Sequence, residues 1–186
     1  MPDEAAADAA AKAFANPAPA RGLRMNGNQI VADTFEVRHD LRDGRLTLYL
    51  DTDLGDNTEV FVSIARIYRI RGDSADYIIE YYNEAGPVGM WRSGKTIDLT
   101  STDFRAELEK LQRAMTLQGE PFVTAYVSDE LKIDFNVYPS QQAPFERGNA
   151  NLTGNAVSIS RGNRVIERDL IVRYPVGEAQ TGKPVM

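Results

Sequence analysis

The chain has 186 residues, of which 42% are hydrophobic and 26% are charged, a composition typical of one ordinary globular domain. Twenty-one Lys and Arg stand against 27 Asp and Glu, for a net charge of -6. This charge argues against nucleic acid or an anionic membrane surface as a general partner. The sequence contains no cysteine and one histidine, His39. Disulfides, thiolate metal sites, cysteine nucleophiles and most histidine-based zinc sites are therefore excluded.

Residues 1–28 differ in composition from the remainder, and we predict that they form a disordered tether. Half of residues 1–20 are alanine, and Asn16-Pro17-Ala18-Pro19 favours an extended spacer. Neither a signal peptide nor a membrane span is recognisable. We expect an anchor or signal to precede this sequence, placing the domain in an extracytoplasmic, periplasmic or membrane-tethered location. A cytoplasmic protein with a loose tail is the alternative.

Residues 29–176 are expected to fold as a single domain, followed by a flexible polar tail over 177–186. Apolar and polar residues alternate over 35–41, 45–51 and 131–137, as half-buried strands require. Residues 60–70 begin apolar on both faces and are expected to form a central strand, and 96–99 also reads as a strand. The dominant structure of the domain is therefore β.

Two hairpins and one helix complete the expected architecture. The turn residues 71–74 join strands at 60–70 and 77–82, and Arg161-Gly162-Asn163 joins 157–159 to 165–174. Phe104, Leu108, Leu111 and Met115 recur at helical spacing. We therefore predict a mainly β protein, an antiparallel β-sandwich of Ig-like or related topology, with one amphipathic α-helix near 102–117.

The segment from Asp51 to Val62 resembles a known group of domains. A strand followed by a pattern close to T-x-L-P-x-x-T-E-V-x-V is similar to the opening of small bacterial extracytoplasmic Ig-like β-sandwich domains of unknown function, many of them lipoprotein-like or membrane-tethered. About a dozen residues carry the resemblance, and Gly55 stands where the pattern has proline. It implies a fold and a location.

An acidic loop is the first candidate site. Asp51, Asp53, Asp56 and Glu59 place four carboxylates within nine residues, and carboxylate oxygens suit calcium. The spacing does not fit an EF-hand, so calcium would be held by a loop at the end of the sandwich. The alternative is a solvated turn whose carboxylates accept hydrogen bonds from local backbone amides. No other cofactor is expected.

An aromatic stretch is the second candidate site. Tyr77, Tyr81, Tyr82 and Trp91 lie close in sequence, and an exposed row of them could stack on sugars or contact a protein. The alternative is that these side chains pack against neighbouring strands.

The remaining motifs favour structural roles. His39 alternates with Val37 and Leu41, so we expect it on the inner face of its strand or at the margin of that face. Four arginines at 161, 164, 168 and 173 lie in the last hairpin, as an anion-binding patch or a solvated strand face. Asn151-Leu152-Thr153 has the form of a glycosylation sequon.

These observations predict a non-enzymatic binding or accessory module that contacts a protein or a cell-envelope component. A membrane would be reached only through a removed anchor. One alternative is a glycan-binding or metal-dependent domain that uses the loop 51–59 or the tyrosine face. A second alternative is a structural subunit that assembles through strand edges. The sequence leaves the oligomeric state open.

Overall fold

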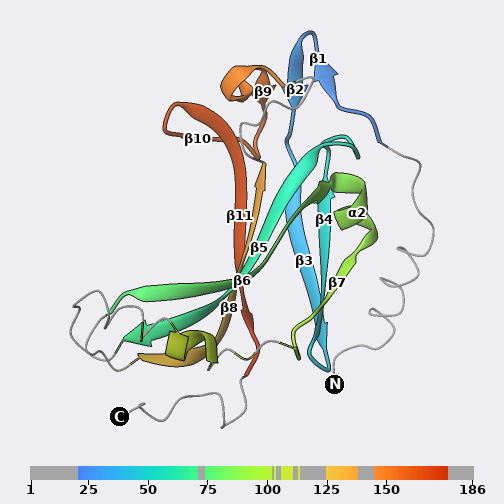
Figure 1. Ribbon diagram of the computed structural model, residues 1–186. Helices are drawn as coiled ribbons and strands as arrows, with labels where there is room; N and C mark the ends of the chain where they lie inside the picture. The colour runs from blue at the N-terminus through green and yellow to red at the C-terminus, as the bar shows by residue number, and fades with distance from the viewer. Residues whose placement is uncertain are drawn as a thin grey trace. The chain divides into compact units, whose positions relative to one another are not determined.

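The protein is mainly β (Figure 1). The computed structural model describes residues 21–70, 74–101, 103, 106–110, 113, 125–137 and 145–175. No helix within these residues has the length and apolar character that a membrane span requires.

Strands follow one another through most of the chain. The short helix α2 (Val88–Ser93) and the 3-10 helix η1 (Arg147–Asn149) interrupt them. The strands are β1 (Met25–Asn26), β2 (Gln29–Val31), β3 (Phe35–Arg42), β4 (Arg45–Thr52), β5 (Glu59–Ile70), β6 (Asp76–Pro87), β7 (Lys95–Asp98), β8 (Ala125–Val137), β9 (Leu152–Thr153), β10 (Ser158–Ser160) and β11 (Asn163–Arg173).

The strands form three sheets, with orders β1-β2-β9, β3-β4-β7 and β10-β11-β8-β5-β6. A sandwich-like arrangement is consistent with these sheets, and the Ig-like topology stays a prediction. Because β5 and β6 are neighbours joined by only a few residues, they form the hairpin expected there. Among the described residues, β2 and β9 differ from the antiparallel expectation, because they run parallel, with Ile30 opposite Leu152.

The chain divides into two compact units. Unit 1 takes the described residues within 1–61, 85–97 and 136–168, and unit 2 those within 62–84, 98–135 and 169–186. The long strands β5, β6, β8 and β11 each contribute residues to both units. The single domain expected over 29–176 stays a prediction, because strand patterns carry no mark of where a long strand passes from one compact unit to the next.

The β3–β4 hairpin is the most regular element of unit 1. Its strands pair antiparallel from Phe35 opposite Thr52 to Arg42 opposite Arg45. Asp43 and Gly44 close it with positive φ values of 50° and 73°, the backbone of a two-residue turn that matches strand twist. The predicted alternation over 45–51 is confirmed, because Leu46, Leu48 and Leu50 are all buried.

The second predicted hairpin is confirmed as β10–β11, with Ser160 opposite Asn163. Arg161 and Gly162 supply its positive φ values of 50° and 81°, so Asn163 already belongs to the strand. The predicted helix is present in part: residues 106–110 and 113 are helical, and Leu108 is buried on them. The other residues of 102–117, apart from Asp103, lie outside the described residues.

Residues 21–28, the described part of the predicted tether, contact other residues of unit 1. Within 21–28, β1 pairs with β2, and Arg21 exchanges two hydrogen bonds with Asp56: its N–H donates to Oδ2 at 2.7 Å, and its carbonyl accepts from the Asp56 N–H at 2.8 Å. The folded part of the chain therefore includes residues 21–28, earlier than the predicted boundary.

Each unit has its own set of buried apolar side chains. In unit 1 these include Ile30, Phe35, Leu46, Leu48, Leu50, Leu54, Val60, Val88, Trp91, Leu152, Val165 and Ile166. In unit 2 they include Val62, Ile64, Ile67, Tyr68, Leu99, Leu108, Val127, Leu131, Ile133, Phe135 and Val172. Leucine, β-branched and aromatic side chains thus account for the core.

Gly154→Ala should strongly destabilise the protein. Gly154 has a φ of 120°, and a Cβ there would lie 2.2 Å from the carbonyl oxygen of Ala32, a backbone atom that accepts a hydrogen bond from the Ala156 N–H at 3.0 Å. Strain and clash together should lower the free energy of unfolding by more than about 2 kcal/mol. Urea unfolding followed by circular dichroism measures this loss.

Gly162→Ala is the matched control. Gly162 also has a positive φ, of 81°, but no atom lies within 4 Å of its Cβ position. Its substitution should cost only about 1 kcal/mol. Equal losses for the two variants would contradict the proposed clash with Ala32.

Candidate functional site

The acidic loop between β4 and β5 is held by Arg92 of α2. The Arg92 Nε donates to Asp56 Oδ1 at 2.9 Å, and its two terminal nitrogens donate to the carbonyl oxygens of Thr52 and Leu54 at 3.0 and 3.2 Å. Asp51 lies 3.6 Å from the same guanidinium. Asp51 and Asp56 therefore share one cation that the chain itself supplies.

The loop in turn caps the first turn of α2. The N–H groups of Val88 and Gly89 donate to the carbonyl oxygens of Thr58 and Asp56 at 2.8 and 2.9 Å. The N–H groups of a first helical turn have no acceptor inside the helix, so the loop carbonyls serve as their hydrogen-bond acceptors. Helix and loop thus satisfy each other's backbone groups.

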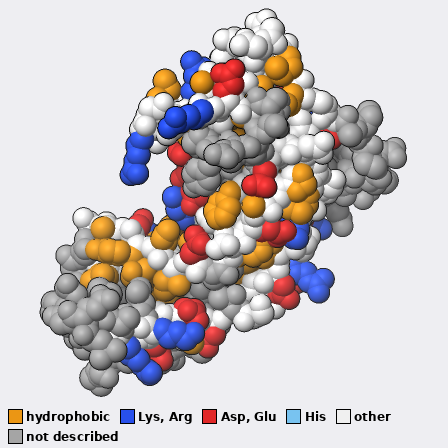
Figure 2. All heavy atoms as spheres, turned by 45° about the horizontal axis from the view of Figure 1, so that its top comes forward, with side chains coloured by type: hydrophobic (Ala, Val, Ile, Leu, Met, Phe, Trp, Pro, Cys, Tyr) orange, Lys and Arg blue, Asp and Glu red, His pale blue; other side chains and the backbone are white. Residues whose placement is uncertain are grey.

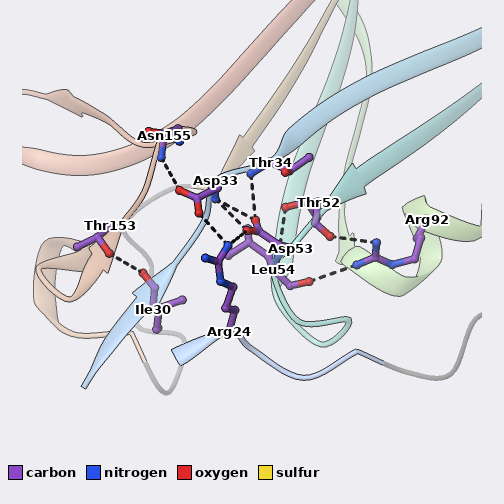
Figure 3. A network of polar contacts seen from close by, with 10 residues as sticks. All are labelled: Arg24, Ile30, Asp33, Thr34, Thr52, Asp53, Leu54, Arg92, Thr153 and Asn155. Carbon is purple, nitrogen blue, oxygen red and sulfur yellow. Dashed lines mark hydrogen bonds and ion pairs between the residues drawn. The ribbon is translucent and has the colours of Figure 1, made fainter. Parts of the chain in front are cut away.

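Asp53 holds a second network, drawn in Figure 3. Its carboxylate accepts hydrogen bonds from the backbone N–H groups of Asp33 and Thr34 and from the guanidinium of Arg24, at 3.0–3.2 Å. Asp33 binds the same Arg24 nitrogen at 2.8 Å and accepts from the N–H of Asn155 at 3.0 Å. Asp53 therefore connects three loops of unit 1.

The four predicted calcium ligands do not converge on one point. Asp51 and Asp56 face Arg92, Asp53 faces the amides of the β2–β3 connection, and Glu59 is exposed at the start of β5. Among the described residues, no group of three or more His, Asp or Glu is placed to hold a metal ion. The carboxylates do accept backbone hydrogen bonds, as in the alternative interpretation, but from amides that are distant in sequence and not from local ones. These contacts do not test calcium binding itself.

The aromatic residues of the second candidate site have different surroundings. Trp91 is fully buried in unit 1, where its indole nitrogen lies 3.5 Å from the Cβ position of Gly86. The prediction that Trp91 belongs to an exposed binding surface was wrong, because Trp91 lies on α2 and its indole is buried. Tyr77 of unit 2 stacks on the buried Tyr68, with ring centroids 5.3 Å apart. The side chain of Tyr81 lies outside the described residues.

Tyr82 is half-buried, and its hydroxyl donates to the carboxylate of Glu84 two residues along β6. Burial, and then this hydrogen bond, raise the pKa of Tyr82 well above its usual range. The phenol is therefore a neutral hydrogen-bond donor over the physiological pH range.

A groove of about 640 Å³ in unit 2 carries both charged and apolar groups. We call it the unit 2 groove. Its lining residues come from the adjacent strands β5, β8 and β11 and are Arg69, Val127, Ser128, Asp129, Glu130, Ile171 and Arg173.

Buried side chains fix the backbone beneath the groove. The Ser128 hydroxyl donates to the carbonyl oxygen of Ile67 at 2.8 Å. The fully buried Arg66 donates to the carbonyl oxygens of Ser128 and Tyr174 at 3.3 and 2.5 Å, with its guanidinium 5.2 Å from the Tyr174 ring centroid. These contacts tie β5 to β8 and to the segment that follows β11.

Charges of both signs line the groove. Arg69 donates to Glu130 at 2.7 Å and to Asp76 at 2.8 Å, and these hydrogen bonds, that to Glu130 first, raise the pKa of Arg69. Arg173 lies 3.9 Å from Asp129 and is 80% exposed. Over the face in Figure 2, basic and acidic side chains are likewise interspersed. The groove therefore offers ion-pair partners of both signs.

Three further sequence motifs have structural explanations. His39 lies opposite Leu48 on the core side of its hairpin yet is exposed, so its expected place at the margin of the inner face is confirmed.

Asn151 is 7% exposed, and its amide bonds the N–H of Glu146 and the carbonyl of Asn28. Glycosylation of the folded chain is therefore blocked. Arg164 donates to the carbonyl of Leu152, within the fold.

Sequence reasoning missed the unit 2 groove and α2. The groove depends on residues from three strands that are far apart in the chain, so no local pattern reports it. The helix did leave a local signal, since Pro87 precedes it and Gly94, with a φ of 94°, ends it.

No protein-family model, curated protein or solved structure matches this chain.

Arg92→Met should destabilise the protein by about 2–4 kcal/mol, because it removes a largely buried cation and leaves Asp56 and two loop carbonyls without that donor. Arg92 is only 15% exposed and Asp56 17% exposed. Chemical denaturation measures the change in the free energy of unfolding. Lys110→Met is the control, because Lys110 is 72% exposed and its ion pair with Glu107 lies at the surface. Similar losses in both variants would contradict a special role for Arg92.

Calcium at millimolar concentration should leave the melting temperature unchanged. The Asp53 oxygens already accept hydrogen bonds from two backbone N–H groups and one guanidinium, and a metal would have to displace these donors. A ligand that binds the folded state raises the midpoint, so differential scanning fluorimetry with and without calcium is decisive. A rise that disappears in Asp53→Asn would show that the loop is a calcium site after all.

Proposed function

We propose that the protein is a non-enzymatic binding module that holds an extended polypeptide segment in the unit 2 groove. The observation that supports this function best is the combination of an exposed isoleucine with paired charges of both signs in a groove of about 640 Å³. A polypeptide carries aliphatic side chains, charges and backbone amides together, and the groove has partners for each.

The apolar contact would be made at Ile171. This side chain is 50% exposed on β11, and Val127 lies buried in the same lining. An exposed aliphatic side chain in a hollow gains stability when a partner's aliphatic side chain covers it. One aliphatic residue of the bound segment is therefore expected here.

The charged contacts would flank that residue. Arg173, at 80% exposure, is available to an acidic group, while Asp129 and Glu130, at 42% and 39%, are available to a basic one. Arg69 is held in place by Glu130 and Asp76, which reduces the side-chain entropy lost on binding. The bound segment should thus carry charge next to its aliphatic residue.

The roles of the other acidic residues support peptide binding over the metal-dependent or glycan-binding use of the loop 51–59. Asp53 and Asp56, the most enclosed carboxylates of the acidic loop, are occupied by arginine and backbone N–H groups that hold unit 1 together. The partner would be a protein of the cell envelope if residues 1–20 act as the extracytoplasmic tether that their composition predicts.

Selection from a random peptide library displayed on phage tests this function. The wild-type protein should enrich extended peptides with an aliphatic residue beside a charged one. In fluorescence anisotropy, Ile171→Glu and Arg173→Glu should each weaken binding of an enriched peptide about tenfold or more.

Ile159→Glu is the matched control. Ile159 is the most exposed isoleucine among the described residues, at 75%, but lies on β10 in unit 1. This variant should bind like the wild type. Failure to enrich any peptide, or enrichment that persists unchanged on Ile171→Glu, would contradict the proposed function.

A further inference from the structure

Independently of the unit 2 groove, the structure assigns a second interaction surface to the outer edge of β3, and we propose that it pairs with β3 of a second copy of this chain. The strand stands at one end of the order β3-β4-β7, beside β4 in Figure 1. The pairing would join two copies into one continuous six-stranded sheet across a two-fold axis.

The backbone of β3 defines which groups reach that edge. In a hairpin closed by a two-residue turn, the flanking residues, here Arg42 and Arg45, exchange both hydrogen bonds, and alternate pairs follow the same pattern. The polar backbone groups of Val37, His39 and Leu41 consequently point away from β4. No strand of the described residues pairs with this edge, and an edge of this kind is a template for another strand.

The side chains on the solvent face of β3 alternate in sign. Glu36, Arg38, Asp40 and Arg42 follow one another on this face, and the Asp40 carboxylate already binds the Arg42 guanidinium at 3.0 Å. An edge with charges of a single sign would repel a second copy of itself. Alternating signs can instead match when the two strands run antiparallel, because the order of charges is then reversed.

The register centred on His39 forms the most matched charge pairs, four, whereas registers centred two residues to either side would form only two each. Centred on His39, an antiparallel pair places Arg38 opposite Asp40 and Glu36 opposite Arg42, each twice by symmetry. Centred on Arg38, the pair would place Glu36 opposite Asp40. Centred on Asp40, it would place Arg38 opposite Arg42. Opposite charges across strands stabilise pairing and like charges oppose it, so the axis lies at His39.

The same register also brings apolar side chains of the inner face together. It places Val37 opposite Leu41 of the second copy, and both side chains are only partly buried in one chain. Pairing would therefore bury more of their apolar surface. The ion pairs fall at the non-hydrogen-bonded positions, where Cα atoms of opposed residues are only about 4.5 Å apart.

Charge reversal tests both the pairing and its register. Sedimentation equilibrium over roughly 1 μM to 1 mM should show a concentration-dependent dimer of the full chain. Glu36→Arg places like charges opposite Arg42 at two symmetric positions and should raise the dissociation constant about tenfold or more. The double variant Glu36→Arg/Arg42→Glu restores opposite charges and should recover wild-type association.

Glu167→Arg, an equal reversal at an exposed position of β11, should leave the dimer unchanged. A strictly monomeric wild-type chain would overturn the proposal. So would a dimer that is insensitive to Glu36→Arg, or a loss of association that the double variant does not repair.

A cysteine trap gives a second, independent measurement. Because the chain has no cysteine, a single introduced thiol reports only its own surroundings. In this register the two residues at position 39 face each other with Cα atoms about 5.5 Å apart, within reach of a disulfide. Oxidised His39→Cys should therefore run as a covalent dimer, whereas Glu36→Cys should stay monomeric on a non-reducing gel. Equal cross-linking of both variants would overturn the register.

Discussion

The mutual capping of α2 and the β4–β5 loop is the contact on which unit 1 depends. A loop that leaves one sheet and enters another exposes carbonyl groups, and a short helix exposes N–H groups at its start. Here the Val88 and Gly89 N–H groups meet loop carbonyls, while Arg92 meets two more and Asp56. Neither segment is long enough to pair all of its own backbone polar groups. The helix therefore supplies hydrogen-bond donors and the loop supplies acceptors.

The hydrogen bonds that hold the β4–β5 loop explain why the loop is acidic. Asp56 accepts hydrogen bonds from Arg92 on one side and from the N–H of Arg21 on the other, and Asp53 links Arg24 to the β2–β3 connection. Four acidic residues in nine suggest a metal site when the cations that face them are distant in sequence. The guanidinium groups of Arg24 and Arg92 replace the metal as the source of positive charge.

The sequence predicted those parts of the fold that local patterns determine. The alternation in β4, the β10–β11 turn and the apolar stretch of β5 each depend on neighbouring residues, and each was recognisable. The parallel pairing of β2 with β9 joins residues more than 100 positions apart, and nothing local reports it. Trp91 shows the same limit: its aromatic ring suggested a surface, but a six-residue helix between Pro87 and Gly94 buries it.

The two proposed surfaces use different chemistry and different units. The unit 2 groove would recognise side chains, and its lining residues all belong to unit 2. The β3 edge would pair backbone with backbone, and its charges only select the register, within unit 1. A dimer joined through β3 would carry two grooves. Since linked sites raise the effective concentration of the second binding event, such a dimer would hold a repetitive or dimeric partner more tightly than one groove alone, even if each groove binds weakly.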